Sequence, residues 1–388
     1  MKVLYLDWEA FGKIDYPFSL ENEFGIEIAY FMHKDFTKIY SEDFLLLFER
    51  YVNELHCDFA FSINYFPLMA EGAKRCGVPY ISVVYDSPQY FLYHKSIYYE
   101  TNHVYVFDSS EVAKLNALGA KGVKYTILPV NSVVINSMLK QEYNIERTTC
   151  EVSFVGQLYD KEPNSFLNLM RGLDDYSKGY IRGLMAGQMN VYGADLIRPA
   201  INDDLLAKMT VADMYQSEID SGIDPKDVYA DLYICRGVTQ IERMDFLKSI
   251  AKKHQVKLFT SSTTSIPNVI NMGETKYYDE MPLIFHNSKI NLNITLRSIK
   301  SGIPLRAMDI IGAGGFLLTN YQSDFLQHFI PDKEYVYFED KNDMLRKIDY
   351  YLEHENQRND IARAGWERAK RQYSFKAVLG KILEESLA

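Results

Sequence analysis

The side chains with the clearest potential for chemistry lie in the segment that begins at Ser301. Ser301 and Gly302 stand just before Pro304, a pattern typical of a loop that enters a helix with proline in its first turn. The free N–H groups of such a helix start can hold a phosphate, and the guanidinium of Arg306 can bind two phosphate oxygens. One turn later, the carboxylate of Asp309 could accept hydrogen bonds from a ribose diol. The same spacing also fits an ordinary helix with a surface Arg–Asp pair, so both interpretations stay open on spacing alone.

A second group of candidates follows the ends of expected β-strands. In doubly wound α/β sheets, ligands bind at the carboxyl ends of the strands. The residues at or just after those positions are Asp7, Glu9, Phe11, Asn64, Asp86, Ser87, Gly156, Gln157, Ser262 and Asn293. Asp86 stands just before Ser87 and Pro88, so a turn in which it holds its own backbone is the alternative to a chemical role.

The elements that must position these residues alternate between strands and helices. Strands are expected at 1–6, 26–31, 58–63, 80–85, 103–107 and 125–128, and again at 151–155, 257–260, 268–270, 290–294, 315–319 and 335–338. Helices are expected at 41–55, 68–75, 109–118 and 342–371, with several more in an insert at about 164–230. Ser41 is expected to cap the first helix, and Gly77 to end the second. The pattern predicts α/β architecture in two doubly wound domains, with a boundary near 130–150.

Charge and composition exclude several classes of protein. Acidic residues outnumber basic ones, 52 against 42, and the net charge of -10 argues against a general nucleic-acid binder. No apolar run reaches the roughly 18 residues of a membrane span, and the first strand runs into Asp7 and Glu9, too short and acidic for a signal peptide. The four cysteines stand singly without a CxxC pair, which favours a reduced, cytoplasmic protein.

Several nucleotide, metal and nucleophile motifs are absent from the sequence. There is no GxGxxG, GxxxxGK[ST], HExxH or GxSxG. The missing glycine motifs argue against a dinucleotide oxidoreductase and a P-loop enzyme. The eight histidines are scattered, so no metal site is expected.

Long segments of the chain resemble one family of bacterial proteins. They are FSINYFPLMAEGAKRCGVPYISVVYDSPQYFLYH at 61–94, MPLIFHNSKINLNITLRSIKSGIPLRAMDIIGAGGFLLTNYQSDF at 281–325 and TQIERMDFLKSIAKKHQVKLFT at 239–260. The family is the CgeB-like group of glycosyltransferases, in which a domain of unknown function precedes a group-1-like glycosyltransferase domain. The resemblance covers nearly the whole chain and is strongest in its second half.

The resemblance implies the GT-B fold, in which two Rossmann-like domains face each other across a cleft. It implies an acceptor-side domain at 1–145, a nucleotide-sugar domain at 146–370 and a C-terminal helix at 371–388 that crosses back to the first domain. The donor would be a nucleotide-diphosphate sugar, with a UDP-sugar favoured, and neither a metal nor another cofactor is expected.

Donor-site roles follow from the same resemblance, position by position. Ser301, Gly302 and Arg306 resemble the diphosphate-binding loop and helix, and Gly156 resembles the glycine that keeps the backbone close to the phosphates. Asp309 resembles the acidic residue that holds the donor ribose. Related enzymes have a Glu eight residues upstream of it, where this chain has Ser301.

The remaining donor-side assignments surround this set. Gln157 and Lys161 are the candidates for the polar or basic position after Gly156. Ser262 and the loop 273–278 would flank the base, and Asn293 ends a neighbouring strand. A locally basic cleft is expected from Arg297, Lys300 and Arg306.

Catalytic and acceptor-side roles fall in the first domain. An inverting enzyme needs a base within hydrogen-bond reach of the acceptor hydroxyl, and Asp86 is the first candidate, followed by Asp7 and Glu9. The expected acceptor-side residues are Phe11, Asn64 and Ser87. In a retaining enzyme the leaving diphosphate could assist instead, so the sequence leaves inversion and retention open.

The implied partners are the nucleotide-sugar donor and a protein or glycan acceptor. No nucleic acid is expected, and peripheral membrane contact stays open. Two other functions also stay open: a non-catalytic nucleotide-sugar-binding or scaffold protein that kept the fold, and an epimerase of GT-B fold that acts without an acceptor.

Overall fold

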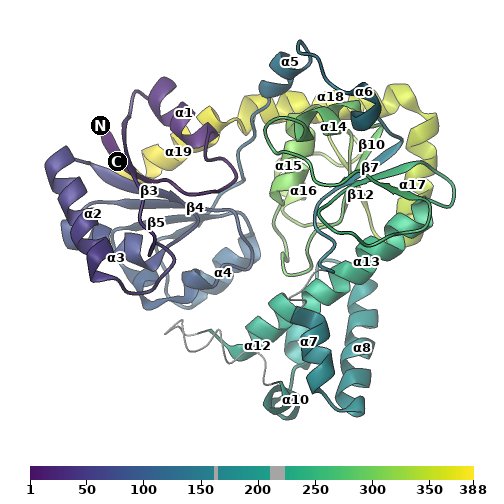
Figure 1. Cartoon of the computed structure of the whole chain (residues 1–388), viewed down its shortest axis with the longest axis horizontal. Helices are drawn as coiled ribbons and strands as arrows, with labels where there is room; N and C mark the ends of the chain where they lie inside the picture. Colours follow the sequence, from purple (N-terminus) through teal and green to yellow (C-terminus); the bar gives the residue numbers. More distant parts are fainter. Residues whose placement is uncertain (161–164, 210–222) are drawn as a thin grey trace. The chain divides into compact units, whose positions relative to one another are not determined.

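The chain folds into two compact units, which are described separately (Figure 1). The computed structural model describes residues 1–160, 165–209 and 223–388. The first unit contains Met1–Pro129 together with Tyr373–Ala388. The second contains the described residues of Val130–Ala212 and of Pro225–Gln372.

The first unit is built on a parallel six-stranded sheet. Its strands are β1 (Lys2–Leu6), β2 (Glu27–Phe31), β3 (Phe59–Ile63), β4 (Tyr80–Val84), β5 (Asn102–Val106) and β6 (Val123–Tyr125), in the spatial order β2-β1-β3-β4-β5-β6. Its helices are α1 (Asp15–Asn22), α2 (Glu42–Leu55), α3 (Pro67–Cys76), α4 (Ser109–Ala117) and α19 (Phe375–Leu387), with 3-10 turns η1 (Tyr90–Tyr93) and η2 (Lys95–Tyr98). The chain crosses the sheet in one direction from β1 to β2 and in the opposite direction from β2 through β3 to β6. Right-handed crossovers therefore place α1 on one face and α2, α3 and α4 on the other.

Local sequence signals explain where these helices begin and end. The Ser41 hydroxyl accepts a hydrogen bond from the Phe44 amide at 3.3 Å, the N-terminal cap expected for α2. Gly77 ends α3 in the left-handed conformation at φ 69°. The predicted start and stop of these two helices are therefore confirmed.

The second unit is also built on a parallel six-stranded sheet. Its strands are β7 (Val152–Val155), β8 (Val256–Phe259), β9 (Val269–Asn271), β10 (Ile290–Asn293), β11 (Leu317–Asn320) and β12 (Val336–Phe338), in the order β12-β11-β10-β7-β8-β9. Outside the insert, its helices are α5 (Val134–Met138), α6 (Ile145–Thr148), α13 (Cys235–Ile250), α14 (Met281–Asn287), α15 (Leu305–Gly312), α16 (Phe325–His328), α17 (Lys341–Glu353) and α18 (Glu355–Gln372). Two doubly wound α/β domains are thus confirmed.

The described part of the predicted insert consists of helices joined by short loops. It contains α7 (Ser165–Gly172), α8 (Asp175–Met189), α9 (Ile197–Ala200), α10 (Asp203–Lys208), α12 (Pro225–Val228) and the π-helical turn η3 (Tyr229–Ile234). The turn η3 runs directly into α13, which connects the insert to the sheet.

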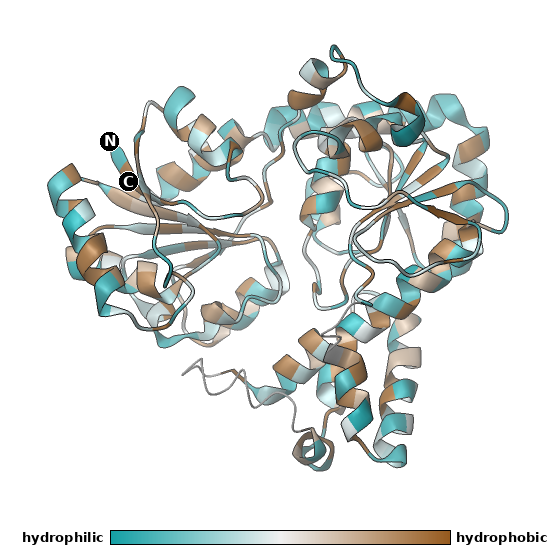
Figure 2. Cartoon of the chain, viewed as in Figure 1, coloured by the Kyte–Doolittle hydropathy of each residue, from teal (hydrophilic) through white to brown (hydrophobic). Residues whose placement is uncertain are grey.

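Apolar residues run along the strands of both sheets, while the helices expose polar faces (Figure 2). In the second unit, α13 and α17 cover one sheet face through Phe246, Leu247, Ile250, Met344 and Ile348, all buried in one core cluster. In the first unit, Phe31 packs edge to face on Phe44 and Phe48, with ring centroids 5.1 and 5.8 Å apart.

The unit boundary differs from the sequence prediction. The prediction ended the first domain at residue 145, whereas the first unit ends at Pro129. The polar stretch that follows packs in the second unit, because Ile135 and Met138 form a cluster with Leu283. Trp366 also donates from Nε1 to the carbonyl of Ser132 at 3.0 Å.

Several local elements also differ from the expectation, among them the helices α13 and α14, which the sequence analysis did not include. The helix α1 was not predicted, and the strand expected at 125–128 lies earlier, at Val123–Tyr125. The single helix expected at 342–371 is two helices, because the backbone of His354 leaves the helical region at ψ 66°.

The described residues bear on two further expectations. All four cysteines are free thiols. Within residues 1–160, 165–209 and 223–388, no helix combines the length and apolar character that a membrane crossing requires.

Replacing either of two helical glycines of the second unit by alanine should change the stability of the protein in opposite directions. A β carbon added at Gly365 would lie 2.3 Å from the carbonyl oxygen of Glu334, whereas one added at Gly183 meets nothing within 4 Å. We expect Gly365→Ala to lower the free energy of unfolding by about 1–3 kcal/mol through overpacking. Gly183→Ala, the control, should raise it by about 0.5–1 kcal/mol. Thermal and urea unfolding measure both, and equal effects of the two variants would contradict the close packing of α18.

Candidate functional site

The strand order of the second unit creates a switch point beside β7. The strand β7 lies between β8 and β10, and the chain leaves it in one direction and later returns on the other side. The loops that follow β7 and β10 therefore diverge at the carboxyl edge, where ligands of such sheets bind.

Arg243 of α13 bridges these two loops. Its side chain is only 2% exposed, and it donates hydrogen bonds to the carbonyl of Gln157 after β7 and, from Nε at 3.2 Å, to that of Ile294 after β10. Its guanidinium also lies 5.0 Å from the ring of Tyr159 and 5.3 Å from that of Phe154. The charge is thus held by carbonyl dipoles and aromatic faces.

Arg306 of α15 lies directly against Gly156. A β carbon at residue 156 would be 2.4 Å from Nη2 of Arg306, and Gly156 has a φ of 147°. Only glycine allows this close approach without moving the guanidinium. The structure therefore brings together two residues that the sequence analysis placed in one donor site.

Neither guanidinium is in direct contact with a carboxylate of the described residues. Within the part of the chain that the structure describes, neither Arg243 nor Arg306 forms an ion pair, and Arg306 forms no hydrogen bond. Burial and the charge of Arg243 lower the pKa of Arg306 to about 10, and burial also lowers the pKa of Arg243. A pKa of about 10 still leaves Arg306 charged at pH 7, so the pair presents positive charge that an anion can neutralise.

Asp309 lies one helical turn after Arg306 and contacts the loop before α14. It accepts a hydrogen bond from the hydroxyl of Tyr277 at 2.9 Å. That loop is held in turn by Arg147, which donates to the carbonyls of Met272 and Glu274 at 2.7 and 3.0 Å. The carboxylate of Asp309 is therefore oriented by a fixed hydroxyl.

Ser301 and Gly302 are held by residues that follow β11. The Ser301 hydroxyl donates to Asp324 at 3.3 Å, and the Asp324 amide donates to the Ser301 carbonyl at 3.1 Å. The Gln322 side chain donates to the carbonyl of Gly302 at 3.2 Å. The conformation of this loop is thus fixed by contacts within the protein.

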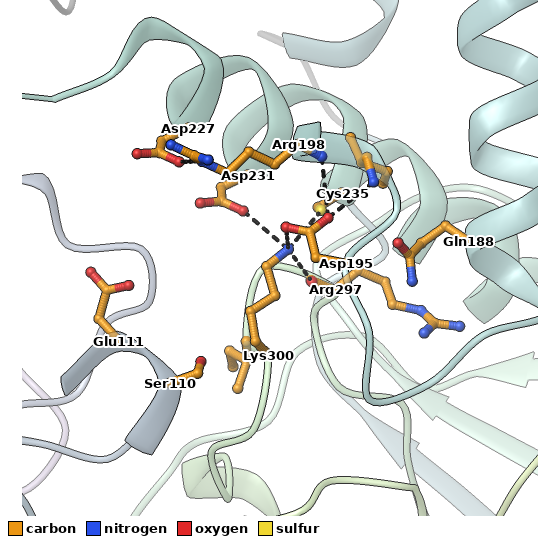
Figure 3. A network of polar contacts seen from close by, with 12 residues as sticks. Ser110, Glu111, Gln188, Asp195, Arg198, Asp227, Asp231, Cys235, Arg297 and Lys300 are labelled. Carbon is orange, nitrogen blue, oxygen red and sulfur yellow. Dashed lines mark hydrogen bonds and ion pairs between the residues drawn. The ribbon is translucent and has the colours of Figure 1, made fainter. Parts of the chain in front are cut away.

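Two of the three residues of the expected basic cluster, Arg297 and Lys300, are paired with carboxylates (Figure 3). Arg297 is buried and paired with Glu242, its Nε 2.8 Å from Oε2, and Lys300 lies 3.1 Å from Asp195 and 3.4 Å from Asp231. Although burial favours the neutral amine, Cys235 and these carboxylates hold the pKa of Lys300 above its usual range. Their charges are therefore used within the protein, and Arg306 is the member without an ion-pair partner in the described residues.

The other predicted donor-side residues have local partners. Ser262 donates to Asp160, and the amide of Asn293 donates to Thr295 and Thr319 at 3.0 and 2.9 Å. The side chain of Gln157 is exposed and accepts from Ser261 at 3.5 Å. Lys161 lies outside the described residues.

In the first unit, Asn64 and Asp86 form one hydrogen-bonded group. Asn64 has a left-handed backbone at φ 63°, and its side-chain oxygen accepts from the amides of Tyr85 and Asp86 at 2.8 and 3.2 Å. Its Nδ2 donates to Oδ2 of Asp86 at 2.6 Å. Surrounding protein raises the pKa of the Asp86 carboxyl, although its side chain reaches the surface, and the bond from Asn64 opposes that rise.

The remaining first-unit candidates lie outside the hydrogen-bonded group of Asn64 and Asp86. The amide of Asp7 donates to the carbonyl of Phe31 at 2.9 Å, and Glu9 forms an exposed ion pair with Lys13 at 2.5 Å. Phe11 is 51% exposed, and Ser87 is half-buried beside Asp86.

The structure adds two residues that the sequence analysis missed, Arg243 and Asp324, and it gives Tyr277, within the predicted loop 273–278, a contact with Asp309. One sequence signal could have revealed the first. Arg243 stands on the same helical stripe as Phe246, Leu247 and Ile250, so a charge occupies a position where a core residue is expected. Among the described residues, no group of three or more His, Cys, Asp or Glu side chains is arranged to hold a metal ion.

Comparison with known proteins identifies the fold. Sucrose-phosphate synthase from Thermosynechococcus elongatus aligns with a TM-score of 0.57 at 9% identity, covering 100% of this chain and 99% of that chain. HepE of Anabaena in complex with UDP-glucose aligns at 0.52 and 10% identity, covering 99% of both chains. The β-glucosyltransferase of T4 phage aligns at 0.52 and 10% identity, covering 100% of this chain and 99% of that one. At such low identity the likeness establishes the GT-B fold alone, as predicted.

A sequence family adds the class of enzyme. Residues 243–384 match a family model described as glycosyl transferase-like. The match begins at Arg243 and includes Ser301, Arg306 and Asp309. No curated protein sequence is similar enough to count as a relative. The chain thus carries a glycosyl transferase-like domain in a GT-B fold, which confirms the predicted class of enzyme.

The buried pair of Glu242 and Arg297 predicts a large loss of stability when one charge is removed. Glu242 is fully buried, so Glu242→Gln would leave Arg297 without its counter-charge and lower the free energy of unfolding by about 3 kcal/mol. Asp245→Asn on the same helix removes a partly exposed pair with Lys341 and should cost at most about 1 kcal/mol. Urea unfolding of both variants tests this, and similar losses would show that burial of the pair is unimportant.

Proposed function

We propose that this protein transfers a sugar from a nucleotide-diphosphate sugar, with a UDP-sugar favoured, to a protein or glycan acceptor without a metal ion. The observation that carries the proposal is the pair Arg243 and Arg306 at the switch point, two guanidiniums without an ion-pair partner in the described residues. Gly156 leaves room for the Arg306 guanidinium against the backbone, where the guanidinium would hold the diphosphate. We also assign the chain to the bacterial, cytoplasmic CgeB-like group, with its N-terminal domain on the acceptor side.

The diphosphate is the leaving group of this reaction. Negative charge develops on it as the bond to the sugar breaks, and fixed positive groups stabilise that charge. Arg306 is partly exposed and would contact the phosphate oxygens, assisted by the amides at the start of α15. Arg243 is buried, so it would hold the loops after β7 and β10 in place, and its positive charge would attract the diphosphate without direct contact.

The nucleoside is held beside the diphosphate in this proposal. Asp309 would accept from the ribose hydroxyls, and Tyr277 would hold the carboxylate in place through their hydrogen bond. The uracil preference draws support from HepE, whose structure contains UDP-glucose.

The acceptor is activated by Asp86 in this proposal. As a general base, the carboxylate would take the proton from the acceptor hydroxyl while the sugar is transferred with inversion. A carboxyl whose pKa is raised is a stronger base than an ordinary one. Asn64 positions it from the neighbouring strand end.

Arg306→Ala tests the donor site. Losing a charged contact should weaken binding of UDP by about tenfold or more, because such contacts contribute ~1.5–3 kcal/mol. Arg346→Ala, which removes an exposed arginine of the same unit, is the matched control and should leave UDP affinity unchanged. Titration calorimetry with UDP and GDP measures both. A change smaller than twofold for Arg306→Ala would refute the contact.

The group of Asn64 and Asp86 tests the catalytic base through its pH dependence. The base must be deprotonated, so kcat/KM should fall as the pH drops through the raised pKa of Asp86. Asn64→Gly keeps the left-handed backbone but removes the hydrogen bond that lowers this pKa, so the acid limb should move to higher pH.

Two further variants complete this test. Asp86→Asn should reduce kcat about 100-fold or more, while Glu23→Gln on the same unit should change neither rate nor profile. An acid limb that stays in place in Asn64→Gly would exclude Asp86 as the titrating base.

A further inference from the structure

A small pocket lies in the helical insert, between the first turns of α8 and the short helix α10. Its volume is about 160 Å³, well above the roughly 10–15 Å³ that a single water molecule requires. The pocket therefore has room for a ligand about the size of one sugar ring. The residues that line it include Tyr176, Tyr180, Asn202, Asp204, Leu205 and Lys208.

This pocket is separate from the carboxyl edge of the sheet, because the insert extends away from the sheet of the second unit (Figure 1). The last residue of α8, Met189, accepts at its carbonyl a hydrogen bond from Arg297 in the loop after β10, at 3.4 Å. Tyr176 stands near the other end of the same helix, about 20 Å away along the helix axis. A ligand of this pocket therefore lies outside a nucleotide site at the sheet edge.

Two tyrosine rings line the pocket from α8. Tyr176 and Tyr180 are four residues apart, so they share one face of the helix. Tyr176 is 79% exposed, and the hydroxyl of Tyr180 donates to the carbonyl of Ala200 at 2.9 Å, which fixes the second ring. An aromatic face carries partial negative charge, which attracts the weakly positive C–H groups of a sugar ring. The two rings thus offer a stacking surface to a saccharide.

Polar groups at the start of α10 can exchange hydrogen bonds with sugar hydroxyls. The side-chain oxygen of Asn202 accepts from the Leu205 amide at 2.8 Å, while its Nδ2 has no acceptor among the described residues. The carboxylate of Asp204 is exposed and, within the same residues, forms no ion pair or hydrogen bond. A donor and an acceptor are therefore available side by side, and each hydroxyl of a sugar can both donate and accept.

The charges around the pocket disfavour an anionic ligand. Asp204 and Lys208 are the charged residues that line it, one of each sign. Lys208 is already paired with Asp174 at 2.8 Å, so a phosphate or carboxylate would meet no unpaired cation among the lining residues and would lie near Asp204. An ammonium group could pair with Asp204, but it would leave the amide donor of Asn202 unused. A neutral ligand with several hydroxyls uses both groups.

We propose that this pocket binds one neutral sugar unit of a glycan. The aromatic face matches the C–H face of such a ring, and the amide donor and the carboxylate match its hydroxyl edge. In the transfer reaction the pocket holds a distal part of the acceptor glycan, about 20 Å along α8 from the loop after β10. This role in the reaction rests on the proposed function, whereas the binding of the sugar does not.

Saturation-transfer difference NMR of the full chain tests the binding with neutral trisaccharides of glucose, galactose, mannose and N-acetylglucosamine. At least one trisaccharide should bind, and saturating UDP should not displace it. Tyr176→Ala should weaken this binding about fivefold through the lost stacking, and Asp204→Ala about tenfold through the lost hydrogen bond. The affinity for UDP, measured by calorimetry, should change less than about twofold in both variants, because the two sites are far apart.

The matched controls remove an exposed ring and an exposed carboxylate elsewhere. Tyr40→Ala removes a ring of the first unit that is 68% exposed, and Asp175→Ala removes a fully exposed carboxylate of α8 that does not line the pocket. Neither variant should change trisaccharide binding.

Four results would overturn the sugar pocket. They are the absence of binding by every trisaccharide, displacement of the bound trisaccharide by UDP, equal losses in the control and pocket variants, and binding of trilysine but of no saccharide, which would indicate a basic peptide as the ligand. A failure of UDP to bind would instead refute the donor site and would leave the sugar pocket supported by its own titrations.

Discussion

The arrangement of the second unit depends on one buried guanidinium. Arg243 reaches the sheet edge from α13 and donates to the carbonyls that follow β7 and β10, which joins the two loops at the switch point. Because its partners are dipoles and not carboxylates, it fixes geometry without neutralising its own charge. Arg306 lies against Gly156, where the positive charge of Arg243 repels its guanidinium. The same interaction thus shapes the edge of the sheet and makes it attractive to an anion.

The neighbouring ion pairs serve a different purpose. Arg297 and Lys300 lie only a few residues from Arg306, yet both are paired with carboxylates from α13 and the insert. These pairs anchor the loop after β10 from one side, while Gln322 and Asp324 anchor it from the other. The helical insert is therefore part of the support of the site, and its acidic residues determine the charge that the loop presents.

Much of the fold could be predicted from the sequence, because alternating strands and helices with clear caps report local physics. Ser41 and Gly77 mark helix ends through contacts within one turn of the chain. The close approach of Gly156 and Arg306 was expected only through family resemblance, since 150 positions separate them. What local patterns could not supply is the choice of partner: nothing near Lys300 in the sequence indicates Asp195 or Asp231. The role of Arg243 was hidden for the same reason, because its acceptors are backbone carbonyls far along the chain.

The last helix has a consequence for the order in which the protein can be completed. Phe375 of α19 packs edge to face on Tyr16 with ring centroids 5.1 Å apart, and Ser386 lies 2.9 Å from the hydroxyl of Tyr105. The first unit therefore includes residues that a ribosome adds only after it has made the whole second unit. During synthesis, the apolar face of α1 stays uncovered until α19 is made, while more than two hundred further residues leave the ribosome. The N-terminal segment is thus the part of the nascent chain that stays accessible to chaperones for the longest time.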